Sequence, residues 1–122
     1  MIVRQYWMDR LQAAFKRRSL VWLIGVRRAG KTLLCKSLPG VEYFDCELPS
    51  VRKALADPEV FWRSRTAGYV ALDEIHRLKD PAEILKIATD HFPAIKVIAT
   101  GSSSLGASSK FRDKLTGRKV DV

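Results

Sequence analysis

The chain has 122 residues, of which 47% are hydrophobic and 29% are charged. This length suits one small domain with one core, and the composition is typical of a soluble globular protein. No apolar run approaches the roughly 20 residues of a membrane helix, and the N-terminus lacks the apolar stretch of a signal peptide. We therefore expect one domain over residues 1–122, a cytoplasmic location and no membrane partner.

The net charge of +9 is concentrated near the N-terminus. Residues 1–40 carry nine lysines or arginines and a single acid, Asp9. Such a segment attracts polyanions, either a nucleic acid or the phosphates of a nucleotide, and it also occurs on an ordinary solvated helix face. Charge alone specifies no base contact, so these interpretations all stay open at this point.

The N-terminal part of the chain predicts a helix, a buried strand and a second helix. Residues 4–18 repeat apolar side chains at helical spacing among arginines and lysines, which indicates an amphipathic helix. Residues 19–25 form a continuous apolar run that ends in glycine, the pattern of a strand covered on both faces of a parallel sheet. Residues 31–38 predict a helix, which the following Pro-Gly pair ends.

A complete G-x-x-x-x-G-K-[ST] motif, the P-loop pattern, spans Gly25–Thr32 and joins that strand to that helix. Its glycines allow the turns in which backbone N–H groups face an anion, and the helix start adds a positive dipole end. Lys31 would reach the β- and γ-phosphates of ATP, and Thr32 would offer its hydroxyl to Mg²⁺. The predicted ATP-binding residues are Gly25, Val26, Arg27, Arg28, Ala29, Gly30, Lys31, Thr32 and Leu33.

The next segments predict two more strands with helices between them. Residues 41–46 alternate and are rich in β-forming residues, so they predict a second strand. Residues 49–65 look helical in pieces, with an interruption at the Asp-Pro pair that begins at Asp57. Residues 68–73 predict a third strand, and this strand runs into a pair of acids.

The acid pair that follows the third strand resembles the metal-binding and catalytic acids of an ATPase. Asp73 would hold Mg²⁺, as the second acid of a P-loop site does. Glu74 would orient and deprotonate the attacking water. The alternative is an acidic helix start after a strand, but the preceding P-loop favours the catalytic interpretation. A small-molecule kinase needs no water-activating glutamate beside the metal acid, whereas a hydrolysing ATPase does.

The remaining elements complete an alternating pattern. Residues 81–91 predict a helix, and residues 94–100 predict a fourth strand. Residues 101–109 are rich in glycine and serine and predict a loop, with a short helix over residues 110–115. Residues 120–122 look like the start of an unfinished fifth strand, which would leave the first strand as an apolar sheet edge. Strands that alternate with helices indicate an α/β fold with a mostly parallel sheet.

Two further segments offer candidate catalytic groups. Ligands of open α/β sheets bind beyond the carboxyl ends of the strands, where residues 100–104 place several hydroxyls. Ser102 is the first candidate to contact the γ-phosphate or the water, Thr100 is the second, and a flexible polar loop is the alternative. Arg118 would stabilise transition-state charge, in its own chain or in a neighbour, unless it is an ordinary solvated residue.

Four segments together resemble the AAA-type P-loop ATPase core of bacterial and archaeal proteins that carry a C-terminal domain of unknown function. They are GVRRAGKT, YVALDEIHRL, KVIATGSSS and LTGR. The resemblance implies a three-layer α/β/α fold with strand order 2-3-4-1 plus the truncated fifth strand. It also implies ATP and Mg²⁺ as cofactors, a water-activating Glu74, a γ-phosphate sensor at Ser102, and a lid and C-terminal domain outside this segment.

We therefore expect Mg²⁺-dependent ATP binding and hydrolysis coupled to that C-terminal domain, with poor turnover by the isolated chain. Two alternatives remain. The basic N-terminal segment would suit a nucleic-acid-binding module that uses ATP as a switch. A small-molecule P-loop kinase is the other, which the Asp73–Glu74 pair disfavours. A homo-oligomer also remains open.

Overall fold

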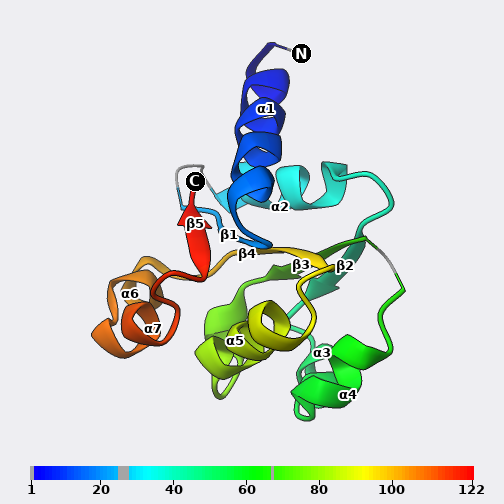
Figure 1. The fold of residues 1–122 in the computed structure, drawn as a ribbon, viewed down its shortest axis with the longest axis vertical. Helices are drawn as coiled ribbons and strands as arrows, with labels where there is room; N and C mark the ends of the chain where they lie inside the picture. The colour runs from blue at the N-terminus through cyan, green and yellow to red at the C-terminus, as the bar shows by residue number, and fades with distance from the viewer. Residues whose placement is uncertain (1, 25–27, 67) are drawn as a thin grey trace.

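The computed structural model describes residues 2–24, 28–66 and 68–122, and Figure 1 shows their fold. The sheet contains β1 (Leu20–Trp22), β2 (Glu42–Asp45), β3 (Tyr69–Asp73), β4 (Lys96–Ala99) and β5 (Lys119–Asp121). The strands lie in the order β2-β3-β4-β1-β5, and every neighbouring pair is parallel. The predicted α/β class and the order of the first four strands are therefore confirmed.

The last strand differs from the expected unfinished stub. Residues 119–121 all pair with β1, and Lys119 lies opposite Leu20. Val122 extends the ladder, because its N–H donates to the Trp22 carbonyl at 2.9 Å. The expectation that β1 would be a bare apolar edge is wrong, since β5 covers β1 and takes the edge position itself.

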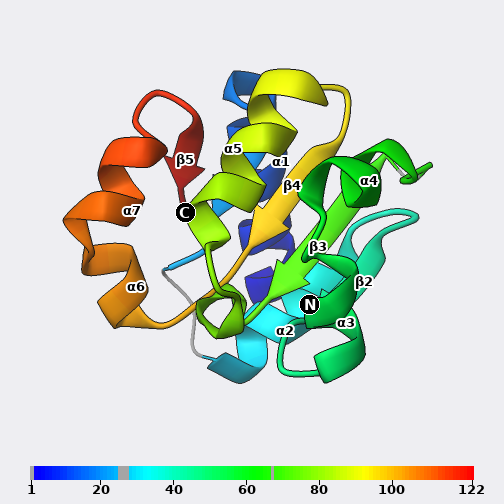
Figure 2. The ribbon, with the colours of Figure 1, turned by 90° about the horizontal axis from the view of Figure 1, so that it is seen from below.

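Helices cover both faces of the sheet. α1 (Ile2–Arg17) and α2 (Arg28–Ser37) pack on one face. The opposite face carries α3 (Pro49–Ala54), α4 (Pro58–Arg63), the 3₁₀ helix η1 (Ile75–Arg77), α5 (Pro81–His91), α6 (Ser103–Ala107) and α7 (Ser109–Lys114). Figure 1 shows these layers on either side of the strands, and Figure 2 looks onto the sheet from the side of α5. Within the described ranges, no helix combines the length and apolar character needed to cross a bilayer.

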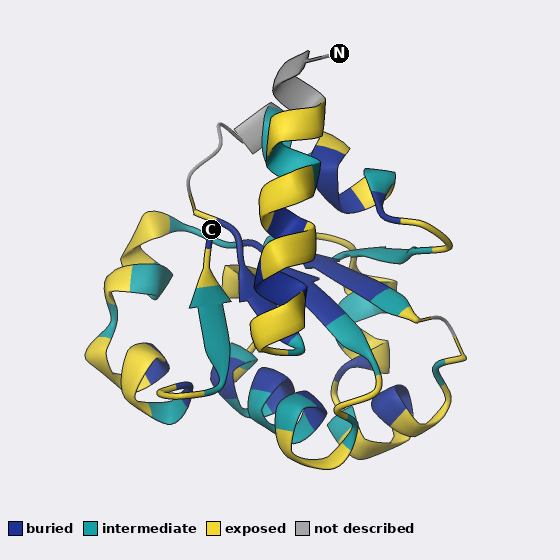
Figure 3. Ribbon diagram, turned by 45° about the horizontal axis from the view of Figure 1, so that its top comes forward, coloured by how far each residue is buried: buried dark blue, intermediate teal, exposed yellow. Residues whose placement is uncertain are grey.

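Successive strand residues point into the two helical layers in turn. In β1, Val21 belongs to the cluster beneath α1 and α2, whereas Leu20 and Trp22 belong to the cluster on the other face. Ala71 of β3 and Ile98 of β4 lie on the same side as Val21. Figure 3 shows the central strands buried between helices whose outer sides are exposed, whereas β2 and β5 are largely half-buried. A strand covered on both faces is apolar throughout, which explains the continuous run that predicted β1.

Residues 103–107 form α6, where the sequence predicted a loop. The Ser102 hydroxyl accepts a hydrogen bond from the Leu105 N–H at 3.3 Å and caps this helix. Ser108 accepts from the Phe111 N–H at 3.3 Å and caps α7 in the same way. Serine is a preferred N-cap residue, so the serines that suggested a loop instead start two short helices.

Glycine is required where the turn after β4 approaches β1. A Cβ atom on Gly101 would lie 2.8 Å from Trp22 Cη2 and 3.4 Å from Ile75 Cγ1. One on Gly106 would lie 3.2 Å from Trp22 Nε1. These separations leave little or no room for a side chain, and glycine alone has none. The turn after β4 therefore rests directly on the indole at the carboxyl end of β1.

Candidate functional site

Asp73 is the centre of the candidate site, at the carboxyl end of β3. It is only 2% exposed, yet its carboxylate accepts hydrogen bonds from hydroxyls on three different elements. Thr32 of α2 and Tyr43 of β2 donate to Oδ2, at 2.8 and 2.5 Å. Thr100, directly after β4, donates to Oδ1. A buried carboxylate is costly unless hydrogen bonds replace its lost hydration, and these hydroxyls provide that replacement.

Thr32 and Asp73 together fit the requirements of Mg²⁺. Hydroxyl and carboxylate oxygens are ligands that this ion accepts, and Mg²⁺ usually takes few protein ligands and completes its shell with water and phosphate oxygens. Among the residues that the structure describes, no group of three His, Cys, Asp or Glu could hold a metal ion. A Mg²⁺ ion at Asp73 would therefore take most of its remaining ligands from water and from the oxygens of a bound phosphate.

The start of α2 provides the other part of the site. Gly25, Val26 and Arg27 lie outside the described residues, as do the side chains of Arg28 and Ala29, so the predictions for these five stay untested. Gly30, Lys31 and Thr32 lie in the first turns of α2 and are half-buried. A helix N-terminus favours anions, so this end of α2 suits a phosphate. Leu33 is 68% exposed.

Glu74 directly follows Asp73 in a left-handed backbone conformation, with φ 62° and ψ 48°. This conformation costs a non-glycine residue about 1–2 kcal/mol, and such strain is concentrated at functional sites. The Glu74 N–H donates to Thr100 Oγ1 at 3.0 Å. Its carboxylate lies 3.5 Å from His76 Nε2, and its side chain is 15% exposed. The structure therefore holds Glu74 beside Asp73 with its carboxylate largely covered.

Thr100 rather than Ser102 supplies the hydroxyl that contacts Asp73. Thr100 is completely buried, and its hydroxyl both donates to Asp73 and accepts from the Glu74 N–H. The Ser102 hydroxyl caps α6 and lies 3.1 Å from Ser104 Oγ. The sequence ranked Ser102 first, because a hydroxyl pattern does not distinguish a strand end from a helix cap. A sensor role for Ser102 stays a prediction.

Tyr43 is a site residue that the sequence analysis missed. Burial and then the hydrogen bond to Asp73 raise the pKa of Tyr43 above its usual range, so the phenol stays protonated and donates. The Lys36 ammonium of α2 lies 4.8 Å from the centre of the Tyr43 ring. Strand alternation puts Tyr43 on the same face as Asp45, but only the structure shows that Asp45 is paired with Asp73.

Arg118 directly precedes the edge strand β5, whereas Asp73 lies at the carboxyl end of the inner strand β3. Its Nε and Nη2 atoms donate to the two carboxylate oxygens of Asp90, at 2.9 and 3.1 Å. The strand registers place Arg118 level with Tyr69, three strands away from β3. Usual strand dimensions then separate it from Asp73 by about 13 Å along the strands and about 14 Å across them. In this structure Arg118 is paired with Asp90 and does not contact Asp73, and its action on a nucleotide, in its own chain or in a neighbouring one, stays a prediction.

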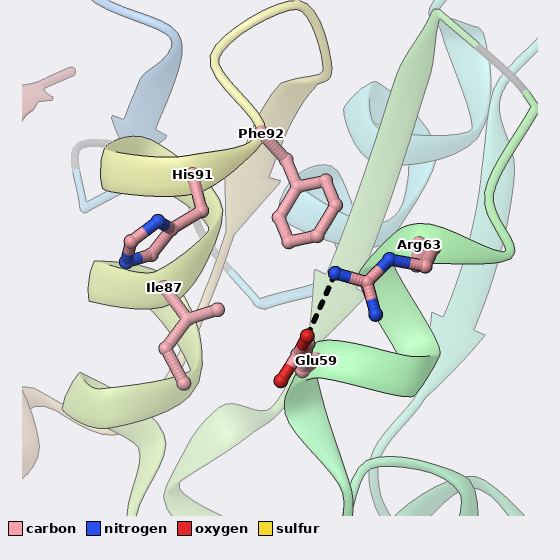
Figure 4. A pocket seen from close by; sticks show the side chains of 5 residues that line it. All are labelled: Glu59, Arg63, Ile87, His91 and Phe92. Carbon is pink, nitrogen blue, oxygen red and sulfur yellow. Dashed lines mark ion pairs between the residues drawn. The ribbon is translucent and has the colours of Figure 1, made fainter.

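A separate cavity of about 430 Å³ lies between α4 and α5 (Figure 4). It is lined by Glu59, Arg63, Ile87, His91 and Phe92. Glu59 and Arg63 form an ion pair at 2.7 Å, and both side chains are well exposed. The charges of this cavity are therefore paired with each other, and none of the predicted site residues contributes to its lining. We assign no chemistry to it.

Comparison with known proteins agrees with this fold. A family model described as an AAA domain matches residues 17–122. Two mycobacterial proteins, Mb2031c of Mycobacterium bovis and Rv2008c of Mycobacterium tuberculosis, are each 34% identical over 124 residues. The alignments cover 97% of this chain and 27% of each relative, so the chain spans about a quarter of the length of these curated relatives. The chain therefore belongs to the AAA domain family and is a P-loop NTPase-like domain.

Proposed function

We propose that the chain binds ATP together with Mg²⁺ at the carboxyl ends of the strands, around Asp73, and hydrolyses the ATP. The 2.8 Å hydrogen bond between Thr32 and Asp73 supports this most strongly. It joins the hydroxyl that follows the P-loop lysine to the acid at the end of β3, which are the two metal-binding groups of a P-loop site. Membership of the AAA domain family adds independent support for nucleotide binding.

Glu74 is the proposed general base. It takes one proton from a water molecule while the water oxygen attacks the γ-phosphorus, and the bond from that phosphorus to the β,γ-bridging oxygen breaks. ADP and phosphate are released, and Glu74 then passes its proton to the phosphate or to solvent. Bound Mg²⁺ would withdraw negative charge from the β- and γ-oxygens. Lys31 and the N-terminus of α2 supply further positive charge to these oxygens.

Coupling to a further domain is part of the proposal. The family that the motifs resemble carries a C-terminal domain, and the two mycobacterial relatives extend well beyond the aligned segment. We expect ATP binding or hydrolysis to change the arrangement of such a domain. Comparing ATP turnover of the 122-residue chain with that of a longer protein containing it tests this part, because equal turnover would argue against coupling.

Calorimetry on two variants tests the metal and base assignments separately. Asp73→Asn should weaken ATP binding chiefly when Mg²⁺ is present, whereas Asp113→Asn, an exposed acid on α7, should leave it unchanged. An equal loss for Asp73→Asn in EDTA would show a purely structural role. Glu74→Gln should keep binding but lower turnover by more than about tenfold, since a general base usually contributes about 10²–10⁴-fold. A smaller loss would rule out Glu74 as the base.

A further inference from the structure

Three hydrogen bonds tie the turn after β3 to the turn after β4. The Glu74 N–H donates to Thr100 Oγ1 at 3.0 Å, and the Ile75 N–H donates to the Thr100 carbonyl at 2.8 Å. The Ser102 N–H donates to Nδ1 of His76 at 3.0 Å. The first two bonds join backbone to Thr100, but the third depends on the His76 side chain, for which the proposed mechanism has no role.

The bond from Ser102 fixes the protonation pattern of the His76 ring. A ring nitrogen that accepts a hydrogen bond carries no proton, so the neutral ring must carry its proton on the other nitrogen, Nε2. That nitrogen lies 3.5 Å from Oε2 of Glu74. One side of the ring is therefore held by the backbone of the β4–α6 turn, and the other side presents an N–H to the Glu74 carboxylate.

We propose that His76 is a positioning residue for Glu74, which it links to the backbone of Ser102. This inference rests on the proposed function, in which Glu74 is the general base. The separation of 3.5 Å is longer than a good hydrogen bond. The contact therefore restricts the orientation of the Glu74 carboxylate without closing a short hydrogen bond to it. The same chain of contacts transmits any movement of the β4–α6 turn to Glu74.

The tautomer of His76 tests the geometry without any need for activity. The sequence contains two histidines, and His91 in the cavity of Figure 4 serves as the matched control. Long-range ¹H–¹⁵N spectra of the nucleotide-free chain, assigned with His91→Gln, should show His76 fixed with its proton on Nε2. A mixture of tautomers like that of His91, or a proton on Nδ1, would overturn the proposal.

Two substitutions at Ser102 test the link to the backbone. Ser102→Pro removes the N–H at a residue whose φ of −69° suits proline, whereas Ser102→Ala removes only the hydroxyl that caps α6. His76 should lose its fixed tautomer in Ser102→Pro and keep it in Ser102→Ala. An unchanged tautomer in the folded proline variant would show that the Ser102 N–H does not hold the ring, which would overturn this link.

Turnover tests the positioning role itself. His76→Ala should lower kcat about 10- to 100-fold, as loss of an orienting partner commonly does, with KM for ATP unchanged. His76→Gln should restore most of the rate, because its amide accepts from Ser102 and donates toward Glu74, and His91→Ala should match the wild type. If Glu74→Gln loses turnover but His76→Ala keeps it, this inference alone fails. If Glu74→Gln keeps turnover, the proposed function fails, whatever the tautomer of His76.

Discussion

Replacing Thr100 with valine tests whether one hydroxyl holds the candidate site together. The hydroxyl donates to Asp73 and accepts from the Glu74 N–H at 3.0 Å, and Thr100 is completely buried. Valine keeps the shape and removes both bonds. Losing a hydrogen bond to a charged group costs about 1.5–3 kcal/mol, and leaving a buried polar group unsatisfied costs about 1–3 kcal/mol. Water can reach part of Glu74, so we expect the free energy of unfolding to fall by about 3 kcal/mol in total.

Urea denaturation measures this loss directly. Thr100→Ser keeps the hydroxyl and removes one buried methyl group, so it should cost only about 1 kcal/mol. Thr116→Val removes an exposed hydroxyl that donates to the Arg112 carbonyl, and it should change the free energy of unfolding by no more than about 0.5 kcal/mol. A loss below about 1 kcal/mol for Thr100→Val would refute the reasoning, because a buried hydroxyl with two such partners must cost more.

Three further predictions follow from charge and burial. Lys31→Ala should abolish Mg·ATP binding in calorimetry while circular dichroism stays native, because Lys31 serves phosphate charge rather than packing; unchanged affinity would contradict the P-loop assignment. Arg118→Ala should leave ATP binding by the chain unchanged, since Arg118 pairs with Asp90 at the far edge of the sheet, and weakened binding would contradict that placement. Burial raises the pKa of the Cys46 thiol from 9.0 to about 12. The unfolded chain therefore releases this proton first, so stability should be full below the ordinary thiol pKa and should fall as the pH rises toward 12. Cys46→Ala should reduce that fall in urea denaturation, and an unchanged pH dependence would count against the burial argument.

The strands and the residues at their ends could be predicted because burial on both faces leaves a clear pattern. β1 and β3 are almost wholly apolar, and Asp73 and Glu74 stand where the second of these runs stops. The strand order carries no such local pattern, and its prediction depended on the resemblance to a family. α6 was missed because its serines cap helices, a role that composition alone does not distinguish from a loop.

Contacts between distant segments could not be predicted from the sequence. Tyr43 reaches Asp73 only because β2 lies beside β3. His76 meets Ser102 only because β3 and β4 are neighbours, so the turns that follow their carboxyl ends lie side by side. The pairing of Arg118 with Asp90 was missed for a related reason, because a short motif does not show at which end of a strand it will stand. Such contacts depend on tertiary arrangement, which local spacing does not encode.

Trp22 provides the chain with a built-in optical reporter. Its indole lies against the positions of Gly101 and Gly106, so it touches the turn that follows β4. A ligand that shifts this turn changes the surroundings of the indole and therefore its emission. Trp62 is completely buried and hydrogen-bonded on the α4 side of the core, which makes it a steady background, and Trp7→Phe would remove the contribution from α1. Binding can thus be followed by intrinsic fluorescence in an unlabelled protein.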